Sequence, residues 1–198
     1  RPEIEKIWDK VNAMDFCQKK DDIIYETYAS MHVVEAEASD ELINNAAENA
    51  DTAIITLSRF SAEGVDRRAI SGDYYLSDAE KSLIDRVSAA FKKTIVVLNS
   101  GGVVDCEHFA ENDKVQGILC GWQGGMEGGM AVADILCGDV NPSGKLGDTI
   151  PKSYDYYENG KIFQTGYEHL DYEDDIYVGY RYFETIPGAA EKVRYPFG

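Results

Sequence analysis

Short apolar runs and stretches with helical spacing alternate along most of the chain. The apolar runs predict strands at residues 31–34, 52–58, 94–99 and 115–120. Apolar residues spaced three and four apart predict helices at residues 3–19, 40–50, 77–92 and 127–136. This order predicts an α/β fold, with a mainly parallel sheet sandwiched between helices and the last three strands as parallel neighbours.

The helix expected at residues 77–92 has a clear start signal. Ser77 and Glu80 have the spacing of a capping box, in which each side chain accepts a hydrogen bond from the other residue's backbone N–H. Leu83, Ile84 and Val87 then follow at helical spacing and should be buried.

The texture of the sequence changes after residue 140. Glycine, proline, tyrosine and acidic residues dominate residues 141–198, and the only strand that we predict there is at residues 176–183. We therefore expect residues 1–198 to form a single α/β domain, with residues 141–198 as a long irregular C-terminal tail that wraps over the rest of it. A tail of this length is unusual in a lone domain and indicates packing on another domain.

Charge and composition exclude some classes of partner. The formal net charge of −17 repels phosphate backbones and disfavours nucleic-acid binding. No stretch is apolar for long enough to span a bilayer, and no signal peptide is visible. The four cysteines have no C-x-x-C spacing, which favours a reducing, cytoplasmic location unless a leader that precedes Arg1 directs secretion.

Neither the cysteines nor the histidines indicate a metal site. Cys120 and Cys137 lie in apolar runs, so we expect both to be buried free thiols. A zinc site needs clustered ligands, whereas His32, His108 and His169 are scattered and are not paired with the cysteines.

A glycine cluster at residues 124–129 follows a predicted strand and opens a predicted helix. A phosphate-binding loop would occupy this position. However, the spacing matches neither G-x-G-x-x-G nor G-x-x-x-x-G-K-[ST], so a nucleotide-dependent enzyme is disfavoured and we expect no cofactor. The alternative, close packing of the helix on the sheet, fits the glycines as well.

The candidate chemistry lies in residues 61–68, which follow a predicted strand. Ligands of open α/β sheets bind beyond the carboxyl ends of strands, where Glu63 would lie. Asp66 and Arg67 can brace this loop. An ordinary charged surface loop is the alternative. No G-x-S-x-G nucleophile elbow is present, so Glu63 is the leading catalytic candidate.

Several segments between about residues 40 and 198 occur in a characteristic order. They are residues 59–84, 95–101, 121–138, 141–146 and 172–198, which include Ser-Ala-Glu-Gly-Val-Asp-Arg, Gly-Trp-Gln-Gly-Gly-Met-Glu-Gly-Gly and Asn-Pro-Ser-Gly-Lys-Leu. This series resembles the C-terminal-type α/β sandwich domain of family 3 β-glucosidases, although its opening strand is missing. Gly147 stands where that family has proline, and Met126 stands where it has glutamine.

The resemblance implies a retaining exo-glycosidase that removes terminal non-reducing β-D-glucosyl residues. Glu63 matches the family's acid/base, and Arg59, Asp66 and Arg67 would support its loop. The nucleophile would be an aspartate about 5–5.5 Å from the acid/base, on a (β/α)₈ barrel that does not fit in this chain. The chain alone should therefore be inactive, and its partners should be that barrel and a β-glucoside or oligosaccharide.

Other interpretations of the sequence stay open. A non-catalytic α/β accessory or sugar-binding module could keep the same fold. The barrel could lie on either side of this domain, and the sequence leaves open whether the protein is a homo-oligomer. Sugar and linkage preference cannot be read here because the barrel would hold the sugar pocket.

Overall fold

Three parallel strands form the central sheet of the protein. The computed structural model describes residues 37–59, 67–161 and 175–198. The strands are β1 (Thr52–Arg59), β2 (Lys93–Ser100) and β3 (Val115–Cys120), in the order β1-β2-β3. Both strand pairs are parallel, which confirms the expected neighbours. The strand and helix expected within residues 3–34 lie outside the described residues.

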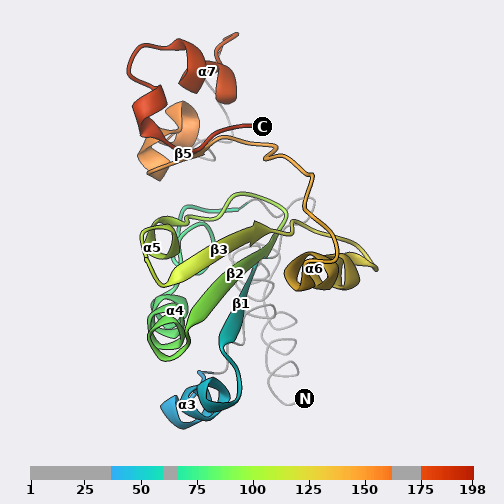
Figure 1. Cartoon of the computed structure of the whole chain (residues 1–198). Helices are drawn as coiled ribbons and strands as arrows, with labels where there is room; N and C mark the ends of the chain where they lie inside the picture. Colours follow the sequence, from blue (N-terminus) through green and yellow to red (C-terminus); the bar gives the residue numbers. More distant parts are fainter. Residues whose placement is uncertain (1–36, 60–66, 162–174) are drawn as a thin grey trace, which may run out of the picture.

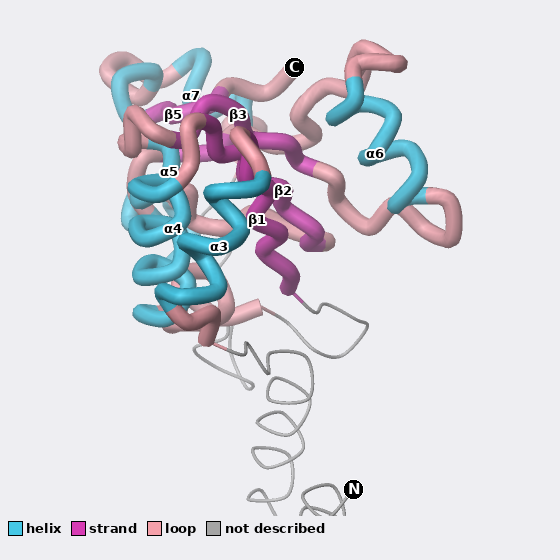
Figure 2. Tube along the Cα trace, turned by 60° about the horizontal axis from the view of Figure 1, so that its bottom comes forward, coloured by secondary structure: helices cyan, strands magenta, loops and turns pink. Residues whose placement is uncertain are grey.

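Helices flank both faces of this sheet. They are α3 (Asp40–Asn49), α4 (Asp78–Ala90), α5 (Glu107–Ala110) and α6 (Gly128–Cys137). Figures 1 and 2 show α3, α4 and α5 on one side of the sheet and α6 on the other. The three longer helices match the predicted ones to within a few residues, so the α/β fold class is confirmed.

The capping box of α4 forms as predicted. The Ser77 hydroxyl accepts from the Glu80 N–H at 3.1 Å, and the Glu80 carboxylate accepts from the Ser77 N–H at 2.8 Å. Along the helix, Ile84 and Val87 are buried, whereas Leu83 is only partly buried. The start of α4 is therefore fixed by its own sequence and its position by core contacts.

The core lies between the sheet and α4. It is formed by side chains of all three strands, of α3, α4 and α5 and of the connecting loops, among them Leu57, Leu76, Ile84, Val96, Val104 and Phe109. β2 is the most deeply buried strand, whereas β1 buries only alternate residues and leaves Ile54 half exposed. The carboxyl ends of β1 and β2 are thus carried on a rigid support.

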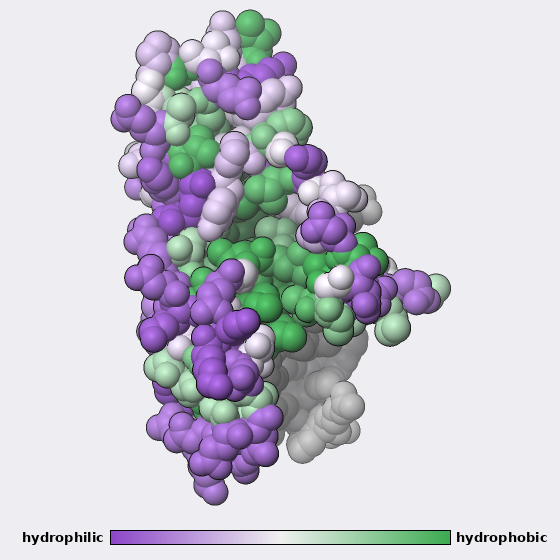
Figure 3. All heavy atoms as spheres, in the orientation of Figure 1, coloured by the Kyte–Doolittle hydropathy of each residue, from purple (hydrophilic) through white to green (hydrophobic). Residues whose placement is uncertain are grey.

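α6 contributes surface rather than core. None of its residues is buried, and Met130 is 65% exposed. Figure 3 shows apolar residues gathered over the sheet and around α6. The expectation of buried thiols is wrong for Cys137, which is exposed because it lies in the last turn of this peripheral helix, while Cys120 is half-buried. Of the three cysteines in the described ranges, Cys106 is the buried one.

The region after residue 140 has more regular structure than we predicted. It contains β4 (Ile150–Pro151), η1 (Tyr154–Tyr156), η2 (Glu158–Lys161), α7 (Tyr180–Thr185), η3 (Ala190–Lys192) and β5 (Val193–Tyr195). β4 and β5 form an antiparallel pair.

The strand expected at residues 176–183 is wrong, because α7 begins at Tyr180. Gly179 has a φ of 60°, which interrupts the extended chain before the helix. The aromatic run then buries one side chain, Phe183, on a helical face, while Tyr180 stays exposed. The apolar and aromatic residues from Tyr180 onward therefore belong to a helix and not to a strand.

Part of this C-terminal region packs on the chain's own core. Ile150 is buried in the core cluster, with Tyr195 packed against it. Arg194 donates to Glu111 at 3.0 Å, and the rings of Tyr74 and Tyr154 lie 5.0 Å apart. The region is therefore joined to the core, to the end of α5 and to the loop before α4 by apolar, ionic and aromatic contacts respectively.

Candidate functional site

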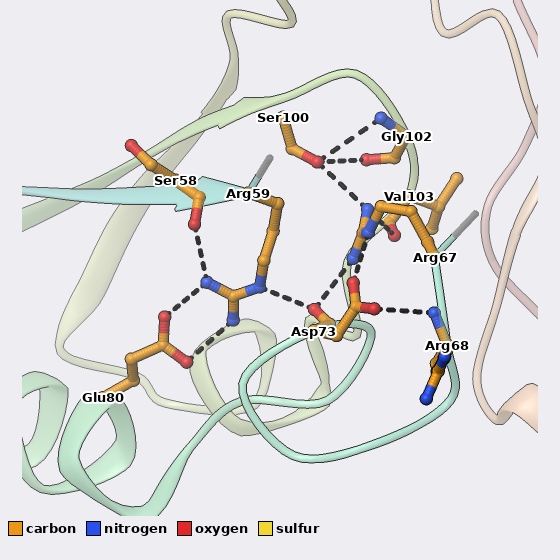
Figure 4. A network of polar contacts seen from close by, with 9 residues as sticks. All are labelled: Ser58, Arg59, Arg67, Arg68, Asp73, Glu80, Ser100, Gly102 and Val103. Atoms are coloured by element: carbon orange, nitrogen blue, oxygen red, sulfur yellow. Dashed lines mark hydrogen bonds and ion pairs between the residues drawn. The ribbon is translucent and has the colours of Figure 1, made fainter. Parts of the chain in front are cut away.

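The carboxyl ends of β1 and β2 bring together the residues of the candidate site. Because the strands are parallel and in register, Arg59 at the end of β1 pairs with Ser100 at the end of β2. Arg67 is the first described residue after the 60–66 segment. Figure 4 shows these side chains converging near Asp73 and Glu80.

Arg59 forms a buried, bidentate ion pair with Glu80. Its two terminal nitrogens lie 2.6 and 2.7 Å from the two Glu80 carboxylate oxygens. The two side chains are only 2% and 1% exposed. The two guanidinium nitrogens each donate to one carboxylate oxygen, so each charge compensates the other inside the protein.

Glu80 therefore has two functions in the fold. Its carboxylate binds Arg59 and also accepts the Ser77 N–H of the capping box. The end of β1 and the start of α4 are thereby connected through one side chain. This connection fixes the strand end from which the predicted catalytic loop departs.

Arg67 and Arg59 both donate to Asp73. Its backbone oxygen accepts from Arg59 Nε at 2.6 Å and from Arg67 Nη2 at 2.8 Å. The Asp73 carboxylate accepts from Arg67 Nε at 2.5 Å and from the Arg68 N–H at 2.6 Å. Two guanidinium groups that flank the 60–66 segment thus contact the same oxygen atom (Figure 4).

Arg67 also reaches the end of β2. Its Nη1 donates to the Ser100 hydroxyl at 3.1 Å and to the Val103 carbonyl at 3.0 Å. The Ser100 hydroxyl in turn donates to the Gly102 carbonyl at 2.8 Å. The chain beyond the 60–66 segment is therefore attached to the neighbouring strand as well as to Asp73.

The predicted site residues divide into two groups. Arg59 and Arg67 are brought together by the structure, through Asp73. Glu63 and Asp66 lie outside the described residues, so their roles and the loop-support role of the arginines stay predictions. Our sequence analysis included Asp73 in the family-like segment 59–84 but gave it no role, and it found Glu80 only as a helix cap.

The glycine cluster and Cys106 show no sign of separate chemistry. A Cβ atom on Gly124 would lie 2.8 Å from the Gly128 Cα, so the turn before α6 needs glycine for close packing. Burial, with a smaller contribution from the Asp105 carboxylate, raises the pKa of Cys106 to about 12, which keeps its thiol protonated near neutral pH.

A metal-binding cluster and a membrane-spanning helix are both absent from the described ranges. Within residues 37–59, 67–161 and 175–198, no three His, Cys, Asp or Glu side chains form a group suited to a metal ion. No helix in these ranges is long and apolar enough to cross a membrane.

Comparison with known proteins identifies the family. Residues 4–180 match the model of the glycosyl hydrolase family 3 C-terminal domain. The chain belongs to glycosyl hydrolase family 3. Over 80% of its length it is 46% identical to beta-glucosidase A of Butyrivibrio fibrisolvens. It is 40% identical to a beta-glucosidase of Ruminococcus albus, again over 80% of its length.

A solved beta-glucosidase structure has the same fold. A beta-glucosidase from Paenibacillus barengoltzii superimposes on 82% of the chain with a TM-score of 0.75 and 37% identity. These matches cover only 22%, 16% and 18% of the three relatives' own lengths. The chain thus spans about a fifth of the relatives that it matches.

Removing the Glu80 carboxylate should destabilise this region strongly. Glu80→Ala leaves the Arg59 charge buried without a counter-charge, which costs about 3–5 kcal/mol. Ser77→Ala removes a capping hydrogen bond and keeps the ion pair, so it should cost only about 1 kcal/mol. Native-state hydrogen exchange of β1 and α4 amides in the two variants measures both costs. Equal costs would contradict a stabilising role for the ion pair.

Proposed function

We propose that this chain is the α/β domain of a retaining β-glucosidase that hydrolyses terminal non-reducing β-D-glucosyl residues. The observation that carries the proposal is the 46% identity to a beta-glucosidase over 80% of the chain. The whole of residues 1–198 forms the domain, with residues 141–198 as its packing tail.

Glu63 acts as the general acid and base in this proposal. It protonates the glycosidic oxygen while an aspartate on a separate (β/α)₈ barrel attacks the anomeric carbon. It then takes a proton from the water that hydrolyses the glycosyl-enzyme. Two carboxylates complete this cycle, so no cofactor is required.

The loop that carries Glu63 is supported at both ends. Arg59 is fixed by the buried Glu80, and Arg67 is bound to Asp73 and Ser100. Asp66 is the third supporting residue of the proposal. Fixing the ends of a short segment restricts its conformations, and catalysis requires the acid to be held in position.

The surface of the domain is consistent with a partner domain. Met126 is fully exposed and Met130 is 65% exposed, and Figure 3 shows apolar residues gathered around α6. Contiguous apolar surface of this kind commonly marks a contact with another domain or protein. The barrel is the proposed partner, and the sugar and linkage preference depends on it.

The chain alone should have no glycosidase activity. It supplies one carboxylate of the pair, and the nucleophile belongs to the barrel. Purified residues 1–198 should not release nitrophenolate from an aryl β-glucoside above the rate of a Glu63→Ala preparation. Turnover that is lost in Glu63→Ala would show that this chain holds a complete active site.

Replacing Glu63 should impair the complete enzyme in a way that depends on the leaving group. Glu63→Ala should lower kcat/KM about 10²–10⁴-fold for a poor leaving group, which needs a proton to depart. Dinitrophenolate departs without a proton, so its glycosylation step should be nearly unaffected. Azide should restore turnover because it attacks the glycosyl-enzyme without help from a base.

The alternative to an acid/base role is that Glu63 has a purely structural role. Such a residue would lower activity on both substrates alike, and azide would have no effect. Equal losses without azide rescue would assign the acid/base role to another carboxylate.

A further inference from the structure

We propose that Asp73 is a positioning residue for the acid/base of this enzyme. Its backbone oxygen contacts the arginines on either side of the 60–66 segment, and its carboxylate holds the two residues that follow the segment. The inference rests on the proposed role of Glu63, but it is drawn from contacts of described residues alone. Our sequence analysis gave Asp73 no function.

The contacts of Asp73 use three different oxygen atoms. The backbone oxygen accepts from Arg59, which precedes the segment, and from Arg67, which follows it. The two carboxylate oxygens accept from the Arg67 side chain and from the Arg68 backbone. One residue therefore contacts both arginines through its backbone oxygen, and its carboxylate adds two contacts on the side that follows the segment.

Asp73 is itself held in a rigid turn. Its N–H donates to the Ile70 carbonyl at 3.2 Å, and the next residue, Tyr74, donates to the Arg68 carbonyl at 3.1 Å. The Tyr74 side chain is buried, and its carbonyl accepts from the Asp105 N–H at 2.8 Å. The turn can therefore serve as a fixed reference for the segment ends.

Limited solvent exposure strengthens this arrangement. The side chains of Arg67 and Asp73 are 16% and 15% exposed. Lys92 and Asp51, which come directly before β2 and β1, form an ion pair whose side chains are 75% and 71% exposed. Salt screens exposed pairs far more than partly buried ones. Asp51 therefore offers a matched carboxylate whose removal should have little effect.

The chemical consequence is selective. If the segment ends move, a general acid between them loses its alignment with the glycosidic oxygen, and a misplacement of about 1 Å can cost about 100-fold in rate. A leaving group that needs no proton is insensitive to that loss. A residue that only stabilises the fold would affect both kinds of substrate equally.

The test uses the complete enzyme with two aryl β-glucosides, one with a poor leaving group and one with dinitrophenolate. Asp73→Ala should lower kcat/KM about 10–100-fold on the first substrate and less than about 3-fold on the second. Asp73→Asn keeps the side-chain size and should give a smaller loss with the same selectivity. Asp51→Ala should match the native enzyme on both substrates.

Glu63→Ala, measured in parallel, separates the two proposals. If Glu63→Ala discriminates between the substrates and neither Asp73 variant does, the positioning role is wrong and the acid/base role stands. If Glu63→Ala does not discriminate, the acid/base role fails and the positioning role fails with it. Where Asp73→Ala does not fold, as judged by thermal unfolding, Asp73→Asn decides.

Discussion

The buried ion pair between Arg59 and Glu80 is the constraint on which the rest of the site depends. Two charges that are almost fully buried must stay paired. Glu80 belongs to the first turn of α4, and Arg59 is the last residue of β1. The pairing therefore joins the strand end to the helix start, while Arg59 Nε donates to the Asp73 carbonyl.

This constraint joins local and long-range structure. The capping box forms from neighbours in sequence, but the same carboxylate binds a side chain 21 residues away. Asp73 adds further long-range contacts, because its backbone oxygen accepts hydrogen bonds from Arg59 and Arg67. Asp73 is in turn held by the backbone hydrogen bonds of its own turn. Arg59 and Arg67, the described residues on either side of the 60–66 segment, are therefore both held at the carboxyl edge of the sheet.

Sequence patterns predicted what depends on local or periodic signals. The strands near Thr52, Lys93 and Val115 and the start of α4 follow from apolar runs and capping chemistry. The helix at Tyr180 was misread because an aromatic run suits both periods until Gly179 breaks the strand. The role of Asp73 could not be predicted, although it lies in the family-like segment 59–84, since its partners Arg59 and Arg67 meet it only in three dimensions.

The central claim is that Asp73 acts through Glu63, and a double-mutant cycle in the complete enzyme tests it most directly. The measured quantity is kcat/KM for a β-glucoside with a poor leaving group, in the native enzyme, Asp73→Ala, Glu63→Ala and the double variant. The account predicts that Asp73→Ala lowers kcat/KM about 10–100-fold in the native background and less than about 2-fold once Glu63 is absent. The same fold-loss in both backgrounds would contradict it, because Asp73 would then act independently of Glu63.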